Sequence, residues 1–130
     1  MQFIAPPSLF SPPPEQDIHA VRGDVLNIDM GFQGVPEIAA NLSAYRLRVG
    51  FRRRQTDTLP FIVVRNAVLE LMPPGETFGG EDIEIAATVA FTPEETNSFP
   101  ATGCVYLVEW TNAVGGANRR ILQGRVTVSD

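Results

Sequence analysis

The sequence predicts an all-β fold, an antiparallel immunoglobulin-like β-sandwich of about seven to eight strands with a Pro-rich N-terminal arm and one short helix. Glycine and proline number 11 each among the 130 residues, which leaves little room for long helices. Apolar and polar side chains alternate along several segments, as in strands that bury one face. Turn signals recur about every ten residues, which is typical of sandwiches. The hydrophobic fraction of 44% suffices for one domain with its own core.

The first sixteen residues form a separate region, an extended arm, and the sandwich is expected over residues 17–130. Prolines at positions 6, 7, 12, 13 and 14 exclude a helix or a central strand from the arm. A free linker would not normally carry the large apolar side chains found here, which are Phe3, Ile4, Leu9 and Phe10. The arm either covers an edge of its own domain or docks on another subunit; plain disorder is a weaker third interpretation.

Three segments of the first half predict strands. Residues 18–21 are short and apolar, and a turn at Arg22-Gly23-Asp24 separates them from residues 26–32, which alternate between apolar and polar. Residues 45–52 alternate in the same way, with arginines on the polar side. A helix with these spacings would spread its apolar side chains around the whole cylinder. We therefore expect two amphipathic strands, joined by a connection over residues 33–43.

The second half predicts shorter and more apolar strands. Residues 59–64 are β-branched and apolar, although Pro60 weakens the start, and residues 68–71 form another short strand. Residues 78–80 predict a loop, and residues 83–91 alternate as a longer strand. Both faces of residues 104–111 are apolar, which indicates a central strand. A glycine-rich hairpin loop then leads to a last strand over residues 121–128.

One helix signal stands between these strands. Thr92 suits the N-cap, Pro93 suits the first helical position, and Glu95 lies where its carboxylate can reach back to the cap amide. Pro100 ends the helix by Phe99, so we expect one or two turns.

The composition argues against several functions. One cysteine and one histidine exclude an internal disulfide, a cysteine cluster and a multi-histidine metal site, and we expect no metal and no cofactor. His19 has no local catalytic motif beside it and no paired-acid motif is present, so we expect no enzyme. The net charge of -5 argues against nucleic acid as a partner. No apolar run approaches the roughly 20 residues of a membrane span, and no signal peptide is visible, which predicts that the chain folds in the cytoplasm of the cell that makes it.

Several single features have an ordinary structural interpretation. Cys104 opens an apolar strand, where a buried, inert thiol is expected, and Trp110 of the same strand should lie in the core. The carboxylates of Glu81, Asp82 and Glu84 suit a solvated start of a strand better than a cation site, because no calcium-loop pattern follows. The Arg-Gly-Asp tripeptide suits a turn better than adhesion.

The basic residues are concentrated at one place in the sequence. Arg52, Arg53 and Arg54 follow Arg46 and Arg48 closely. They form either a solvated strand end or a contact with an acidic neighbouring subunit.

Four motifs follow one another along the chain. They are a strand with Arg-Gly-Asp over residues 22–32, a Tyr-x-Leu-x-Val strand with arginines over residues 45–54, a strand that runs into Thr-Pro-Glu-Glu-Thr and Phe-Pro over residues 83–100, and a Val-Tyr-Leu-Val-Glu-Trp-Thr hairpin closed by Leu-x-Gly-x-Val-Thr-Val over residues 105–128. Together, over residues 18–130, they resemble small tailed-bacteriophage virion proteins. The chain is similar to the N-terminal β-sandwich domain of upper baseplate and tail-fibre proteins.

This resemblance implies a non-enzymatic virion protein, an adaptor for the tail, the baseplate or fibre attachment. It would assemble through contacts with other virion structural proteins, in several copies that could form a homo-oligomer. A capsid decoration or head-fibre protein is one alternative, and a carbohydrate- or cell-surface-binding module is another. The residues expected at interfaces are Phe3, Ile4, Leu9 and Phe10 of the arm and Arg52, Arg53 and Arg54.

Overall fold

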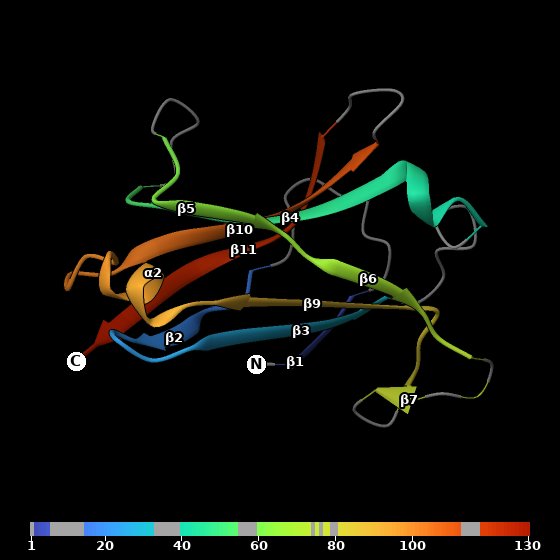
Figure 1. Cartoon of the computed structure of the whole chain (residues 1–130), viewed down its shortest axis with the longest axis horizontal. Coiled ribbons are helices and arrows are strands. Elements are labelled where there is room, and N and C mark those ends of the chain that lie inside the picture. Colours follow the sequence, from blue (N-terminus) through green and yellow to red (C-terminus); the bar gives the residue numbers. More distant parts are fainter. Residues whose placement is uncertain are drawn as a thin grey trace.

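The chain folds into two packed β-sheets in the computed structural model, which describes residues 2–5, 15–32, 40–54, 60–73, 75, 77–78, 81–112 and 118–130 (Figure 1). One sheet has four strands in the order β1 (Gln2–Ala5), β3 (Leu26–Phe32), β9 (Ile85–Phe91) and β6 (Val68–Leu71). The other has five strands in the order β2 (Ile18–Val21), β11 (Asn118–Ser129), β10 (Cys104–Asn112), β4 (Tyr45–Arg52) and β5 (Val63–Asn66). The predicted all-β sandwich is confirmed. The strand order is compatible with an immunoglobulin-like arrangement.

Most predicted strands lie where the alternation placed them, but the bounds of three strands and of one loop differ. The strand expected over residues 121–128 is β11, which begins earlier, at Asn118. The strand expected over residues 59–64 is β5, which begins only at Val63. The preceding Ile62 N–H already donates to the Phe51 carbonyl at 2.7 Å, but Pro60 has no N–H to continue the ladder, and residue 59 lies outside the described residues. The strand expected from residue 83 is β9, which begins at Ile85. The loop expected at residues 78–80 borders a small ribbon, in which β7 (Thr77–Phe78) pairs with β8 (Glu81–Asp82).

The described parts of the arm contact both sheets of their own domain. β1 runs parallel to β3, from the pair Gln2 and Asp29 to the pair Ala5 and Phe32. At the other end of the arm, the Gln16 N–H donates to the Gln123 carbonyl on β11 at 2.9 Å. The arm therefore covers one edge of its own domain at β3.

Contacts between the arm's apolar side chains and another subunit stay a prediction. Leu9 and Phe10 lie outside the described residues, and so do the side chains of Phe3 and Ile4.

Aromatic rings fill the space between the two sheets. Phe51 of β4 lies 4.9 Å from Phe91 of β9 and 4.7 Å from Phe99, measured between ring centroids. Trp110 of β10 lies 5.1 Å from Phe32 of β3. Such tilted and edge-on pairs add about 0.5–1.5 kcal/mol each beyond the area that they bury. Trp110 is buried, as the sequence predicted.

A short helix, α2 (Pro93–Asn97), lies between β9 and β10, and its N-terminus has the predicted capping box. The Thr92 hydroxyl accepts from the Glu95 N–H at 3.2 Å, and the Glu95 carboxylate accepts from the Thr92 N–H at 2.9 Å. That carboxylate also pairs with Arg65 of β5 at 2.7 Å. Burial raises the pKa of Glu95, but the hydrogen bonds from Thr92 and Arg65 and the charge of Arg65 outweigh burial and hold this pKa below its ordinary value.

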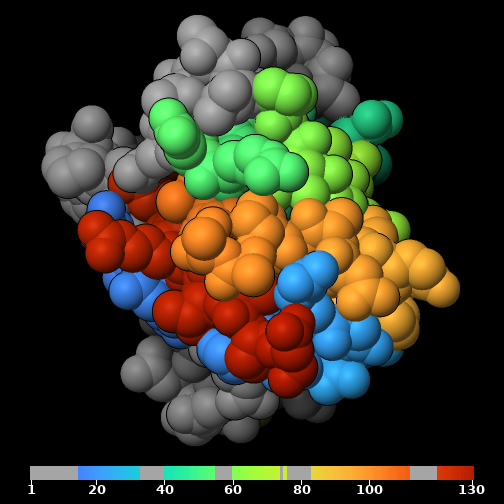
Figure 2. Space-filling model, turned by 90° about the vertical axis from the view of Figure 1, so that its left-hand side faces the viewer, coloured from blue at the N-terminus to red at the C-terminus, as the bar shows by residue number. Residues whose placement is uncertain are grey.

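The helix also holds the Arg-Gly-Asp turn. The buried Thr96 hydroxyl accepts from the Gly23 N–H at 3.1 Å and donates to the Asp24 carbonyl at 2.8 Å. Gly23 has a φ of 86°, which favours glycine in this turn. Figure 2 shows this turn (blue) close to the C-terminal residues (red), where the Arg22 N–H donates to the Ser129 carbonyl at 2.8 Å. The predicted turn is confirmed, and its backbone is fixed from two sides.

Removing the cap should destabilise the domain. We expect Thr92→Ala to lower the free energy of unfolding by about 0.5–2 kcal/mol, because the Glu95 N–H loses its acceptor. Thr92→Ser, which retains the hydroxyl, is the matched control and should stay close to the parent protein. Chemical denaturation monitored by circular dichroism measures both, and equal midpoints for Thr92→Ala and Thr92→Ser would contradict the capping role.

The thiol of Cys104 should react slowly in the native state. Its residue is only 6% exposed, and burial raises the pKa of the thiol to about 11. We expect labelling by a thiol reagent at neutral pH to be slow in buffer and fast in denaturant. An exposed reference is Thr102→Cys combined with Cys104→Ala. If Cys104 in the native protein is labelled as fast as this reference cysteine, the thiol faces solvent, which contradicts the register of β10 described above.

Candidate protein interface

The outward side of the five-stranded sheet carries arginines from two strands that are far apart in the sequence. On β4, Leu47, Val49 and Phe51 are buried between the sheets, so the alternate residues project outward. The pairing of β10 with both neighbours aligns rows of residues across this side. One row is Arg52, Val105 and Arg125, and another is Arg48, Glu109 and Arg120. We call these four arginines, together with Arg46 at the start of β4, the arginine face.

Charge divides unequally between the strands of the two sheets. The strands of the five-stranded sheet contain seven arginines and one carboxylate, Glu109. The described strands of the four-stranded sheet contain two carboxylates, Asp29 and Glu70, and no basic residue. All ten basic residues of the sequence are arginines. Five of these seven arginines form the arginine face, so a chain of negative net charge has one side rich in arginine. Two carboxylates of the N-terminal region border it at β11: Glu15 accepts from the Gln123 side chain at 3.3 Å, and Asp17 accepts from the Arg125 N–H at 2.9 Å.

An aromatic ring lies on the arginine face. The guanidinium carbon of Arg52 is 4.1 Å from the ring centroid of Phe61, and that of Arg48 is 5.2 Å away. The ring fits between them because it lies against Gly50, where any Cβ would overlap it. Stacking of this kind holds the two guanidinium groups in place on the sheet surface.

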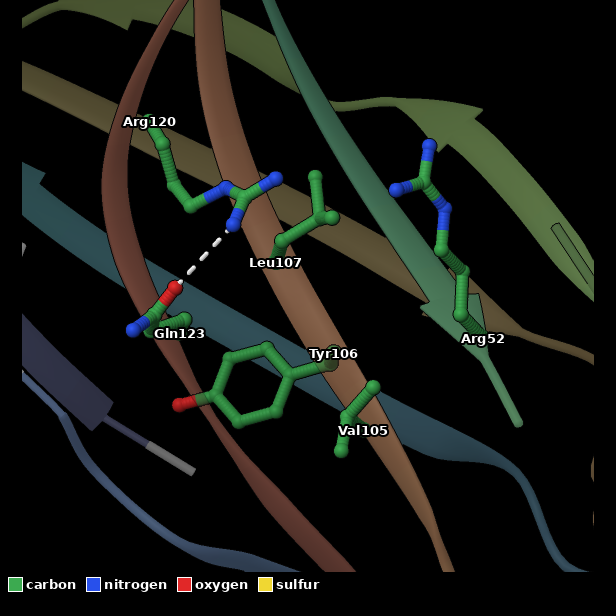
Figure 3. A pocket seen from close by; sticks show the side chains of 6 residues that line it. All are labelled: Arg52, Val105, Tyr106, Leu107, Arg120 and Gln123. Carbon is green, nitrogen blue, oxygen red and sulfur yellow. Dashed lines mark hydrogen bonds between the residues drawn. The ribbon is translucent and has the colours of Figure 1, made fainter. Parts of the chain in front are cut away.

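A buried leucine lies at the centre of the arginine face. Leu107 projects away from the core, yet only 5% of its surface is exposed. Figure 3 shows it beside a cavity of about 10 Å³, with Arg52 on one side and Arg120 and Gln123 on the other. Arg120 donates to the Gln123 side-chain oxygen at 3.3 Å. The long polar side chains thus shield an apolar centre, which is the usual anatomy of a protein interface.

One carboxylate is enclosed among the arginines. Glu109 accepts from Arg48 at 2.7 Å, and the Glu109 side chain is 12% exposed. The pair is partly shielded from water, so it orients Arg48 more firmly than a fully exposed ion pair would.

Of the predicted interface residues, the structure brings Arg52 onto the arginine face with Arg46 and Arg48. Arg53 and Arg54 follow the end of β4 and are exposed. Sequence reasoning missed Arg120, Arg125, Leu107 and Phe61. No local signal could have found the first three as a group, because only the register of β10 against β4 and β11 brings them together.

The other singled-out residues have structural contacts. The ring nitrogens of the exposed His19 lie 2.8 Å from the Thr127 hydroxyl and 2.9 Å from the Ser129 hydroxyl, which joins β2 to β11. The Glu84 N–H donates to the Phe32 carbonyl at 2.9 Å and positions the start of β9.

Within the described ranges, no group of three or more metal-ligating side chains is found. The helices among the same residues are all too short or too polar to span a membrane.

Gly50 is the position where a small change should disturb the arginine face most. We expect Gly50→Ala to displace the Phe61 ring and to lower the free energy of unfolding by about 1–3 kcal/mol. Adding Phe61→Ala to Gly50→Ala removes the ring with which the new methyl group would overlap. The double variant should therefore lose less than the sum of the two single variants, as a double-mutant cycle by chemical denaturation measures. Additive losses would show that the ring does not lie against Gly50.

Comparisons with known proteins give little beyond the fold. No family model matches the sequence, and no curated protein matches it. A solved structure with a similar chain is a cysteine protease inhibitor from Entamoeba histolytica, with 12% sequence identity and a TM-score of 0.43. The match covers 98% of this chain and 96% of that chain.

Proposed function

We propose that this protein is a non-enzymatic structural protein of a bacteriophage virion, an adaptor in the tail, the baseplate or the fibre attachment. It assembles by docking its arginine face on a neighbouring virion protein. The observation that carries the docking role is the alignment of Arg48, Arg52, Arg120 and Arg125 around Leu107. The order of sequence motifs supports the virion location.

The chemistry of the arginine face suits protein contact. Guanidinium groups bind carboxylates through two parallel hydrogen bonds and stack on flat groups, and arginine is enriched in interfaces whereas lysine is depleted. Here Arg48 and Arg52 lie close to the Phe61 ring, so they lose less side-chain entropy when a partner binds. Leu107 is buried beneath these side chains, so it supports the arginine stems from below and leaves the guanidinium groups as the contact surface.

A location on the capsid is the second candidate. A capsid decoration or head-fibre protein would use the same rigid sandwich and the same basic surface. The arginine face is equally suited to either place, so the distinction depends on where the protein is found in the particle.

The test is incorporation into the particle. We expect mass spectrometry of purified virions to find the wild-type protein, and Arg46→Glu with Arg125→Glu to reduce its content about tenfold, because reversed charges repel an acidic partner. The matched control, Val25→Glu with Ala101→Glu, adds two carboxylates to exposed positions outside the strands of both sheets and should be incorporated normally. Both variants should melt close to the parent temperature.

Each outcome addresses a separate part of the proposal. Absence of the wild-type protein from virions would overturn the virion role. Normal incorporation of the charge-reversed variant would overturn the role of the arginine face. A truncation that lacks residues 1–14 retains the contact of Gln16 with β11 and measures how much the arm adds to incorporation.

A further inference from the structure

The two outward sides of the sandwich have complementary charge. We infer that copies of this chain stack head to tail, with the arginine face of one copy on the outward side of the four-stranded sheet of the next. This inference deepens the proposed assembly role and rests on it. The occupant of the arginine face is thus a second copy, and charge complementarity is the main reason.

The receiving surface is the outward side of β3, β9 and β6. Strand pairing aligns Asp29, Thr88 and Val68 in one row and Gly31, Ala86 and Glu70 in the next. Val68 is 71% exposed. A shallow hollow of about 320 Å³ lies on this side, and its lining includes Asn27, Asp29, Val68 and Thr88. Arg65 also lines it, and the charge of this arginine is balanced by its ion pair with Glu95 at 2.7 Å. We call it the acidic face, because Asp29 and Glu70 are the charged residues of its strands.

Both faces carry their charges on the two strands that flank a central strand. Arg52 and Arg125 flank the central strand β10 on either side. Asp29 and Glu70 lie on β3 and β6, which flank the central strand β9 on either side. Strands two positions apart are roughly 9–10 Å from each other in both sheets. Arg52 and Arg125 share one row, whereas Asp29 and Glu70 lie two residues apart along their strands. The long arginine side chains can cover this offset when one face lies on the other.

The apolar parts of the two faces also fit. The centre of the acidic face has short side chains, those of Ala86, Thr88 and Ala90 on β9. Their shortness leaves room for the aliphatic stems of arginines, which can lie along such a surface while the guanidinium groups reach the carboxylates. The exposed Val68 would gain cover from the partner, at roughly 25 cal/mol for each Å² of apolar surface removed from water.

Such a contact repeats from copy to copy. The two faces lie on opposite sides of one sandwich and differ from each other, so the contact is heterologous and leaves one free face of each kind. Heterologous contacts build rings or open stacks, which agrees with a protein expected in several copies per particle.

Two variants test the stacking in solution by sedimentation velocity. Arg46→Glu with Arg125→Glu blocks the arginine face, and Asp29→Arg with Glu70→Arg blocks the acidic face. We expect the wild-type protein to associate as its concentration rises, and each blocked variant alone to associate about tenfold more weakly. A mixture of the two should associate again, because each brings the face that the other lacks. Because Asp29 is half-buried, Glu70→Arg alone is measured as well, with folding checked by circular dichroism.

Three results would overturn the stacking. A wild-type protein that stays monomeric at every concentration has no such contact. Variants blocked at the acidic face that associate like the wild type would show that arginine faces meet each other or another surface. A monomeric wild-type protein that binds single-stranded DNA, and loses binding on Arg46→Glu with Arg125→Glu, would make the arginine face a nucleic-acid site. The stacking and the proposed function can be told apart. If the protein stays monomeric in sedimentation, but its incorporation into virions still depends on the arginine face, then the stacking is wrong and the proposed function stands, with a different protein as the partner.

Discussion

The register of β10 between β4 and β11 determines both the core and the outward surface. Tyr106, Val108 and Trp110 project inward and are buried, while Leu107 and Glu109 project outward. A slip by one residue would exchange these two sets. Tyr106 fixes the register further, because its hydroxyl donates to the Gln16 carbonyl. Burial and the charge of Asp17 raise the pKa of Tyr106, so the hydroxyl keeps the proton that it donates.

An irregularity in the ladder completes the arginine face. The register of β11 against β10 shifts between Val108 and Glu109, so Val108 pairs with Leu122 but Glu109 pairs with Arg120. The extra residue, Ile121, is 3% exposed. Without this bulge, Ile121 would stand opposite Glu109 and Arg120 would lie one position further along. The bulge thus lets two consecutive apolar residues, Ile121 and Leu122, be buried, and it also brings an arginine beside the carboxylate.

The sequence predicts those features that depend on neighbours along the chain. Leu26–Phe32 and Tyr45–Arg52 alternate cleanly and form strands with the predicted bounds, and the capping box at Thr92 depends on four adjacent residues. The sequence does not predict the bulge in β11. Regular alternation would place Ile121 and Gln123 on the same side of this strand, whereas the bulge separates them. Nor does the sequence predict where Phe61 lies, because that position depends on the absence of a side chain at Gly50, eleven residues earlier. The arginine face depends on the pairing of β4 with β10, whose partners run from Arg52 with Val105 to Tyr45 with Asn112, and no local pattern records contacts between residues so far apart in the sequence.

The distribution of charge matters more for this protein than its net value of -5. Copies of a negative chain repel one another at long range, but salt screens this repulsion beyond about 8–10 Å. Contacts between faces act within that distance, where the arginines of one copy would lie close to the carboxylates of the next in the proposed stack. Repulsion between whole molecules therefore disfavours random association, whereas aligned faces still attract. In the proposed stack, the arginines lie in the strands of one sheet, and the strands of the other sheet carry only carboxylates among their charged residues. This division of charge would favour one relative orientation of two copies above others. This orientational preference is the property that an ordered assembly requires.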